Sequence, residues 1–343
     1  MKKYFWLLIA IIGLYYLYSG FTGAETEAMN LSSEITYDTY TDFIPDTDCY
    51  WGYRAGKVLH YTADGINDFT ISVNAAQPVI SVGDLLTVYD EGKDELYGYD
   101  RHGEELWEYK AGGSIEDVKT SPGENIFMVY LKDSVHHMAE INGKGAKLND
   151  WVASDDYVMD YDFSGDTVYV ASANTSDKLG GRITAYNRSG DLIWSQELAG
   201  QVPLMIRATD EGVSAILDKK VLAVSAKGKM LFEKELKADY GCIGEDGDIF
   251  AYAEGNLYGQ AMDGRSLFKV SLPGVERVYP EGSGVLALAG RTVSLYGPDG
   301  RAEATYDAMK DIDYLVPMKG KGKILAVGRS GADLITLPQG GVK

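Results

Sequence analysis

Cysteine and histidine are scarce in this chain, whose 343 residues include two cysteines and four histidines. Cys49 and Cys242 do not form a paired-cysteine metal motif, and the adjacent His136 and His137 point to opposite faces of a regular strand. The sequence contains no Gly-x-Ser-x-Gly elbow and no phosphate-binding loop. We therefore assign no catalytic, cofactor-binding or metal-ligating residue, and expect neither an enzyme nor a cofactor.

Basic residues are also few compared with acidic residues. The chain has 32 lysines and arginines against 51 aspartates and glutamates, a formal net charge of −19. Proteins bind nucleic acid through clusters of positive charge that release counterions from the phosphates. This composition argues against nucleic acid as a partner. It favours a soluble surface that repels copies of itself, so we expect a monomer.

Long hydrophobic runs are missing except at the start of the chain. Lys2 and Lys3 precede an uncharged run from Tyr4 to Ala24, which is 21 residues long. A membrane-spanning helix needs roughly 20 apolar residues. We expect residues 1–24 to be a transmembrane signal-anchor, with a cleaved export signal as the alternative. The lysines stay in the cytoplasm by the positive-inside rule, so a single-pass cell-membrane protein results, with residues 25–33 as a polar tether outside.

Sustained helical periodicity is absent as well, which argues against an α-helical body. Instead, a glycine recurs every 36 to 45 residues, usually with a hydrophobic residue four positions before it and an aliphatic and an aromatic residue three and four positions after it. The glycines of this series are Gly65, Gly103, Gly145, Gly190, Gly228, Gly264 and Gly300. A period of this length built from short strands is typical of a propeller or another repeat array.

A second glycine series lies 18 to 22 residues after the first, and consists of Gly83, Gly123, Gly165, Gly212, Gly247, Gly284 and Gly322. Each member opens a run rich in β-branched and aromatic residues, such as Ile126 to Tyr130, which predicts a strand. Asp-Gly pairs, as at Gly264 and Gly300, predict tight hairpin turns. Each repeat is therefore expected to be a small antiparallel sheet, and a ring of such sheets buries both faces of each.

The two ends of the repeat region predict the number of blades. The last repeat stops at a hairpin turn and lacks its outer strand, which the alternating segment Glu34–Tyr40 can supply. This predicts an all-β, eight-bladed β-propeller with four-stranded blades over residues 34–343, closed by an N-terminal strand. Seven blades is the alternative, because the first repeat around Cys49 is irregular. The recurring aromatic residues share the period of the fold, so we expect them to pack between blades.

Three further features carry expectations. Cys49 and Cys242 fall in the first and sixth repeats, which predicts two buried free thiols rather than a disulfide. In the acidic stretch Asp155–Asp166, three carboxylates have the chemistry of calcium ligands, although a solvated blade edge is the favoured interpretation. The insertion Ser172–Gly181 lengthens one loop, and loops on one rim are where propellers usually bind partners. Its candidate interaction residues are Asn174, Thr175, Asp177 and Lys178.

The repeat segments Gly103–Trp107 and Gly190–Trp194 carry a family resemblance. They resemble the repeats of quinoprotein-like propellers, the superfamily of pyrroloquinoline-quinone dehydrogenases and of the outer-membrane assembly propeller lipoprotein. The chain is also similar to membrane-anchored propeller proteins of unknown function from Gram-positive bacteria. The resemblance implies eight four-stranded blades and, in the non-enzymatic branch, a scaffold that holds partner proteins at a membrane. The dehydrogenases carry a vicinal cysteine pair, which this chain lacks.

We therefore expect a membrane-tethered extracytoplasmic propeller that binds a partner protein or an envelope polymer without catalysis. Two alternatives stay open. One is an enzyme or cofactor binder that uses the central channel, and carboxylates, arginine or histidine converging at a channel mouth would favour it. The other is a cell-wall glycan binder that uses exposed aromatic residues such as Trp51 or Trp151.

Overall fold

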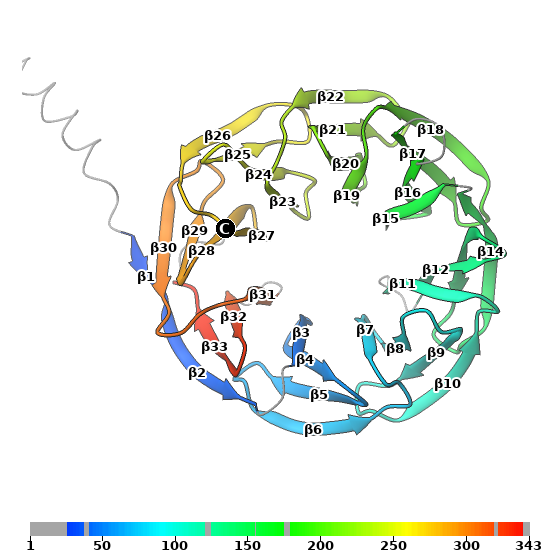
Figure 1. The fold of residues 1–343 in the computed structure, drawn as a ribbon, viewed down its shortest axis with the longest axis horizontal. Helices are drawn as coiled ribbons and strands as arrows, with labels where there is room; N and C mark the ends of the chain where they lie inside the picture. Colours follow the sequence, from blue (N-terminus) through cyan, green and yellow to red (C-terminus); the bar gives the residue numbers. More distant parts are fainter. Residues whose placement is uncertain are drawn as a thin grey trace, which may run out of the picture.

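The computed structural model describes residues 26–37, 41–120, 125–154, 156–174, 179–318 and 322–338. The regular secondary structure in these ranges is β-strand, and the strands form eight sheets arranged in a ring (Figure 1). The predicted eight-bladed propeller is confirmed, and the seven-bladed alternative is wrong. No helix within the described ranges is long and apolar enough to cross a membrane. The expected anchor, residues 1–24, lies outside them.

The first four blades follow the chain from the inner to the outer strand. Blade 1 contains β3 (Asp42–Pro45), β4 (Cys49–Arg54), β5 (Lys57–Thr62) and β6 (Asn67–Ser72). Blade 2 contains β7 (Pro78–Val82), β8 (Leu86–Asp90), β9 (Glu95–Tyr99) and β10 (Glu105–Lys110). Blade 3 contains β11 (Ser114–Thr120), β12 (Ile126–Lys132), β13 (Val135–Ile141) and β14 (Lys147–Ser154). Blade 4 contains β15 (Tyr157–Ser164), β16 (Thr167–Asn174), β17 (Gly180–Asn187) and β18 (Leu192–Ala199).

The last four blades keep this order. The N-terminal segment supplies a fifth strand to blade 7 and the fourth, outer strand to blade 8. Blade 5 contains β19 (Pro203–Thr209), β20 (Gly212–Leu217), β21 (Lys220–Ser225) and β22 (Met230–Glu235). Blade 6 contains β23 (Tyr240–Ile243), β24 (Ile249–Ala253), β25 (Asn256–Gln260) and β26 (Ser266–Ser271). Blade 7 contains β27 (Arg277–Glu281), β28 (Gly284–Ala289), β29 (Thr292–Tyr296), β30 (Ala302–Asp307) and β1 (Glu27–Ala28). Blade 8 contains β31 (Tyr314–Met318), β32 (Lys323–Gly328), β33 (Gly331–Thr336) and β2 (Asn30–Thr36).

The core consists of layers between neighbouring blades. In the second strands β12, β20 and β24, nearly every residue is buried, because neighbouring blades cover both faces. Such strands read as continuous hydrophobic runs rather than alternating ones. The described residues form one hydrophobic cluster at each of the eight contacts between blades. The cluster between blades 8 and 1 joins Leu334 to Tyr50, so the ring is closed.

The recurring aromatic residues pack between blades, as the sequence predicted. Trp107, on the outer strand of blade 2, lies against the turn of blade 3 at Gly145. Its Nε1 donates a hydrogen bond to the carbonyl oxygen of Gly143 at 2.9 Å. Trp194 repeats the contact from blade 4 to blade 5, donating to Ala226 at 3.0 Å. The indole side chains of Trp107 and Trp194 thus each bind the hairpin turn of the next blade.

Replacing Gly190 by alanine is expected to destabilise the propeller by about 3 kcal/mol, because a strained backbone and a steric clash add together. Gly190 has a φ of 85°, and an added Cβ would lie 2.5 Å from Cγ of Trp151. Gly200→Ala is the matched control, since Gly200 has a φ of 70° and no atom within 4 Å of an added Cβ. Chemical denaturation compares the two, and equal losses would show that the ring contact contributes nothing.

β2 closes the ring as the outer strand of blade 8. It pairs antiparallel with β33, from Asn30 opposite Thr336 to Thr36 opposite Gly331. Closure by an N-terminal strand is confirmed, but the strand lies four residues earlier than the predicted segment Glu34–Tyr40. Residues 30–33, expected to be part of the polar tether 25–33, therefore belong to the propeller. Their side chains lie on the outer rim, mostly exposed, and this explains their polar sequence.

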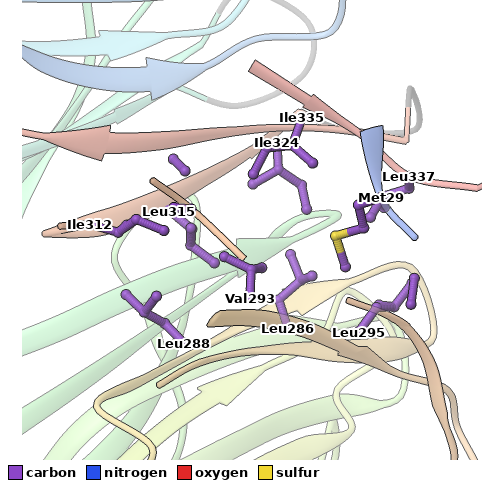
Figure 2. Close-up of a cluster of buried hydrophobic side chains, with 13 residues drawn as sticks. Met29, Leu286, Leu288, Val293, Leu295, Ile312, Leu315, Ile324, Ile335 and Leu337 are labelled. Carbon is purple, nitrogen blue, oxygen red and sulfur yellow. The ribbon is translucent and has the colours of Figure 1, made fainter. Parts of the chain in front are cut away.

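The N-terminal segment also binds blade 7, which the sequence did not predict. β1 pairs parallel with β30, with Glu27 opposite Ala304. The backbone N–H of Met29 then donates to the carbonyl oxygen of Thr305 at 2.8 Å. The Met29 side chain is 5% exposed and lies among Leu286, Leu295 and Leu337 at the contact between blades 7 and 8 (Figure 2). One short segment therefore joins two blades.

Candidate functional site

The inner strands define two ends of the ring axis. We name the end at which the inner strands start the upper end, and the end at which they finish the lower end. Neighbouring strands of a blade are antiparallel, so the loop between the second and third strands also lies at the upper end.

The inner strands of blades 3, 4 and 5 each contain a β-bulge near the upper end. Their pairing with the second strand skips Glu116 in β11, Met159 in β15 and Leu204 in β19. The inner pairs of the other five blades show no register shift in the described residues. Bulges re-aim side chains and are over-represented beside binding sites. Three consecutive bulges single out this arc of the upper end.

Large apolar side chains are exposed along the same arc. Tyr157 is 56% exposed, Met159 37%, Leu204 49% and Met205 38%, and Tyr240, the first residue of β23 in blade 6, is 42% exposed. We call these five residues the upper-end patch. A single exposed apolar residue is ordinary, whereas a group on neighbouring strands is a candidate interaction surface. Tyrosine and methionine are enriched in protein interfaces.

A small acidic pocket of about 180 Å³ adjoins the patch at Tyr157 and Met159. The carboxylates that line it are Glu91, Glu116, Asp117 and Asp160. Lys119 pairs with one of them, Asp160, at 2.6 Å. Burial raises the pKa of Asp117, although the nearby lysine opposes this shift. A cationic side chain entering the pocket would relieve the repulsion among these carboxylates.

The two adjacent histidines have separate surroundings, as the alternation of strand side chains predicted. His136 packs edge-on against Tyr157, with 5.2 Å between ring centroids, and its Nε2 lies 3.0 Å from Oε2 of Glu116. His137 stacks on Tyr130, on the other face of the strand. His136 therefore supports both the patch and the acidic pocket.

The acidic stretch joins blade 4 to blade 5. Oδ2 of Asp160 accepts the backbone N–H of Ile206 at 2.8 Å, and Oδ2 of Asp162 accepts that of Ala208 at 2.8 Å. Within the described part of the stretch, the interpretation as a solvated edge holds for Asp166, whose side chain is 96% exposed. In the described part of the chain, no group of three or more His, Cys, Asp or Glu side chains has the arrangement of a metal site.

The predicted interaction loop begins beside the patch. Asn174 ends β16, and its neighbour Ala173 pairs with Tyr157 of the patch. The other three candidates, Thr175, Asp177 and Lys178, lie outside the described residues. Leu179 follows them and is 54% exposed. The insertion and the patch therefore lie at the same end of blade 4, and an interaction through the loop stays a prediction.

The two tryptophans proposed for glycan binding are buried, and that proposal was wrong for both residues. Trp51 is fully buried and Trp151 is 9% exposed. Trp51 donates from Nε1 to the buried carboxylate of Asp46 at 3.2 Å. Trp151 lies against the turn at Gly190 of the next blade. Neither ring can stack on a polysaccharide at the surface.

Two other cavities open on the ring. The larger, about 740 Å³, lies at the upper end between blades 1 and 2. The Asp90 carboxylate in its wall accepts hydrogen bonds from the backbone N–H groups of Ala76 and Gln77, so the role of this carboxylate is structural. The other, about 360 Å³, lies at the lower end and brings Arg207, Glu245 and Glu281 together. Such convergence is the feature expected of a ligand-binding channel mouth.

The cysteines are free and buried, as predicted. Burial raises the pKa of Cys49 to about 12 and raises that of Cys242 even further. A thiol must ionise to react, so neither group is a nucleophile at neutral pH. They lie in blades 1 and 6 and cannot form the vicinal pair of the quinone-dependent dehydrogenases. The two glutamates of the lower cavity also do not suit an anionic quinone cofactor.

Comparison with known proteins gives a family and a fold. The family model for outer membrane protein assembly factor BamB matches residues 69–271. No curated protein matches the chain. The C-terminal WD40 domain of Sif2 is similar in structure, with a TM-score of 0.69 and 12% identity over 92% of this chain and 100% of that domain. The Dos1 propeller has a TM-score of 0.68 and 11% identity over 92% and 96%. At these identities the likeness shows the fold alone.

Proposed function

This chain belongs to the PQQ-like propeller family of the outer membrane protein assembly factor BamB, and we propose that it is an interaction scaffold whose upper-end patch binds a partner protein. The observation that carries the proposal is the run of three bulges, which displays Met159 at the acidic pocket and Leu204 on the inner strand of the next blade. Apolar anchors within a charged rim are the usual composition of a binding hot spot. The partner segment has apolar side chains next to a lysine or arginine.

The partner is a different protein rather than a second copy or an envelope polymer. Two copies with a net charge of −19 each repel, and the acidic pocket would face acidic surfaces. The two tryptophans considered for stacking on a polysaccharide, Trp51 and Trp151, are buried. The propeller therefore acts as a monomer and performs no chemistry at the patch.

We also propose that residues 1–24 anchor the propeller in the cell membrane as a single-pass segment, with the propeller outside the cytoplasm. The uncharged run after Lys3 supports this. The directions of the first two strands indicate how the propeller is oriented relative to the membrane. β1 runs parallel to β30 and β2 runs antiparallel to β33, so both strands run toward the upper end. An anchor ending at Ala24 holds the lower end nearer the membrane and leaves the patch facing away from it.

Photo-crosslinking tests the scaffold proposal in the full chain in its own membranes. A photoreactive residue at Tyr240 is expected to capture one partner protein, whereas the same residue at Leu192, 63% exposed on β18, is expected to capture none. In the double variant M159D/L204D the yield from Tyr240 should fall at least about tenfold, because two apolar anchors become charged. Mass spectrometry of the crosslinked peptide identifies the partner segment.

The same preparations provide the controls. Glu116→Lys should also weaken the crosslink, because it reverses one charge of the acidic pocket, and removal of residues 1–24 should release the chain from the membrane fraction. Equal capture from Leu192, or an acidic partner segment without lysine or arginine, would rule out the patch as the binding site.

One observation favours a second function, the binding of a small ligand. Arg207, Glu245 and Glu281 converge at the lower end, where the scaffold proposal needs no charged residues.

A further inference from the structure

Two lysines converge on one tyrosine at the outer rim of the ring, where β22 of blade 5 lies beside blade 6 (Figure 1). Nζ of Lys269, on β26, lies 5.1 Å from the centroid of the Tyr258 ring, and Nζ of Lys234, on β22, lies 5.7 Å from it. Both distances are within the range of a cation–π contact. Lys269 is exposed and the other two side chains are half-buried, so a ligand in solution can reach the group.

The two ammonium groups have no carboxylate partner among the described residues. Strands β24, β25 and β26 of blade 6 contain neither aspartate nor glutamate. Glu233 and Glu235 flank Lys234 in sequence but project from the opposite face of β22. Both pair with Lys220 instead, at 2.6 and 3.0 Å. Two positive charges therefore face each other without a counter-ion in a chain whose net charge is −19, and this arrangement indicates an anionic ligand.

Gln260 fixes one of the two ammonium groups. Its Oε1 accepts a hydrogen bond from Nζ of Lys234 at 3.1 Å. Gln260 is 3% exposed, and its Nε2 has no hydrogen-bond partner among the described residues. A buried donor without an acceptor is costly, so such groups are normally paired. An acceptor is therefore missing beside Lys234, and this is a second, independent indication of a ligand that carries oxygen atoms.

The charge and the donors of this group fit a phosphate monoester. A phosphate monoester carries about −1.5 to −2 charges at pH 7 and has three acceptor oxygens. Lys234 and Lys269 supply two positive charges, and the Tyr258 hydroxyl is a third donor beside their ammonium groups. Lysine binds phosphate as a point charge, and hydrogen bonds between charged groups are the stronger ones. A carboxylate has one charge and two oxygens, so it matches less of the group.

We propose that Lys234, Lys269 and Tyr258 bind a phosphate monoester, whose oxygens accept hydrogen bonds from both ammonium groups and from the tyrosine hydroxyl. The source of the phosphate is either a small organic phosphate in solution or a phosphorylated side chain of a protein. This site lies on the outer rim, whereas the upper-end patch lies on inner strands. It depends neither on the patch nor on the membrane anchor.

Calorimetric titration of the full chain in a non-ionic detergent tests the proposal with two probes, glycerol 3-phosphate and N-acetyl-phosphoserine amide. Binding is expected at pH 8 and should weaken about fivefold or more at pH 5, because the phosphate loses its second charge near pH 6. The double variant K234M/K269M should weaken binding at pH 8 at least about tenfold, because both charged donors are removed while the methylene chains stay. Tighter binding of glycerol 3-phosphate identifies a small organic phosphate as the source, and tighter binding of the phosphoserine derivative identifies a protein side chain.

A matched variant separates this site from a general effect of net charge. Lys227 and Lys229 are two exposed lysines in the hairpin turn of blade 5, and K227M/K229M should leave both affinities unchanged. N-acetylglycine, which carries one carboxylate, should bind at least about tenfold more weakly than either phosphate probe. Absence of binding by both phosphate probes, wild-type affinity in K234M/K269M, or an equal loss in K227M/K229M would overturn the proposal.

Discussion

Replacing Ile35 by aspartate is expected to lower the free energy of unfolding by about 4 kcal/mol or more. Ile35 is 4% exposed and packs with Val327 and Leu334 in the cluster between blades 8 and 1. An aspartate at this position loses the apolar contacts and places a carboxylate in an apolar layer. Because β2 is the outer strand of blade 8, its release also exposes the edge of β33 to other chains.

Leu31→Asp is the matched control for this substitution. Leu31 lies on the same strand but is 46% exposed, so its replacement should cost less than about 1 kcal/mol. Guanidinium denaturation followed by tryptophan fluorescence gives both values, and small-angle scattering detects an opened ring. A similar loss in the two variants would contradict the role assigned to the inner face of β2.

The second large effect is expected at Asp46, directly after the inner strand of blade 1. Its side chain is 7% exposed, binds the guanidinium of Arg101 in blade 2, and accepts the Nε1 hydrogen of Trp51. Asp46→Ala leaves that buried indole N–H without an acceptor and removes the counter-charge of the arginine. The expected cost is about 3 kcal/mol.

An exposed ion pair between blades provides the comparison. Lys323 of blade 8 lies 2.9 Å from Asp64 of blade 1, and the Asp64 side chain is 78% exposed. Asp64→Ala should therefore cost less than about 1 kcal/mol, because water replaces the lost partner. The two variants are compared by their denaturation midpoints. If Asp64→Ala were as damaging as Asp46→Ala, burial would not be the reason for the effect at Asp46.

The ring of blades was predictable because its determinants are local and periodic. The turn glycines, such as Gly190 and Gly228, have positive φ angles at the third hairpin of each blade, so their spacing reports the blade length. The closing strand was harder to place. Its residues Asn30 to Ser33 face outward and only Ile35 is buried, so most of the strand has the composition of a linker.

The upper-end patch was not predictable, because it depends on strand register. Met159 and Leu204 have the composition of core residues, and only the bulges turn them outward. Trp151 was misinterpreted for a related reason. It follows Gly145 by six positions instead of the usual four, so it seemed to lie outside the repeat, yet it packs on Gly190 as Trp107 packs on Gly145.

Closure by β2 has a consequence for synthesis of the chain. The hydroxyls of Ser32 and Thr336 meet at 2.5 Å although they are 304 positions apart. A ribosome makes Met29 and Ile35 early, and their partners on β33 appear only near the end of translation. Until then these side chains stay uncovered and the β-edges of the growing chain are available for mispairing. A prematurely terminated chain never buries these side chains and is degraded by proteases. The pairing of β2 with β33 therefore distinguishes complete chains from truncated ones.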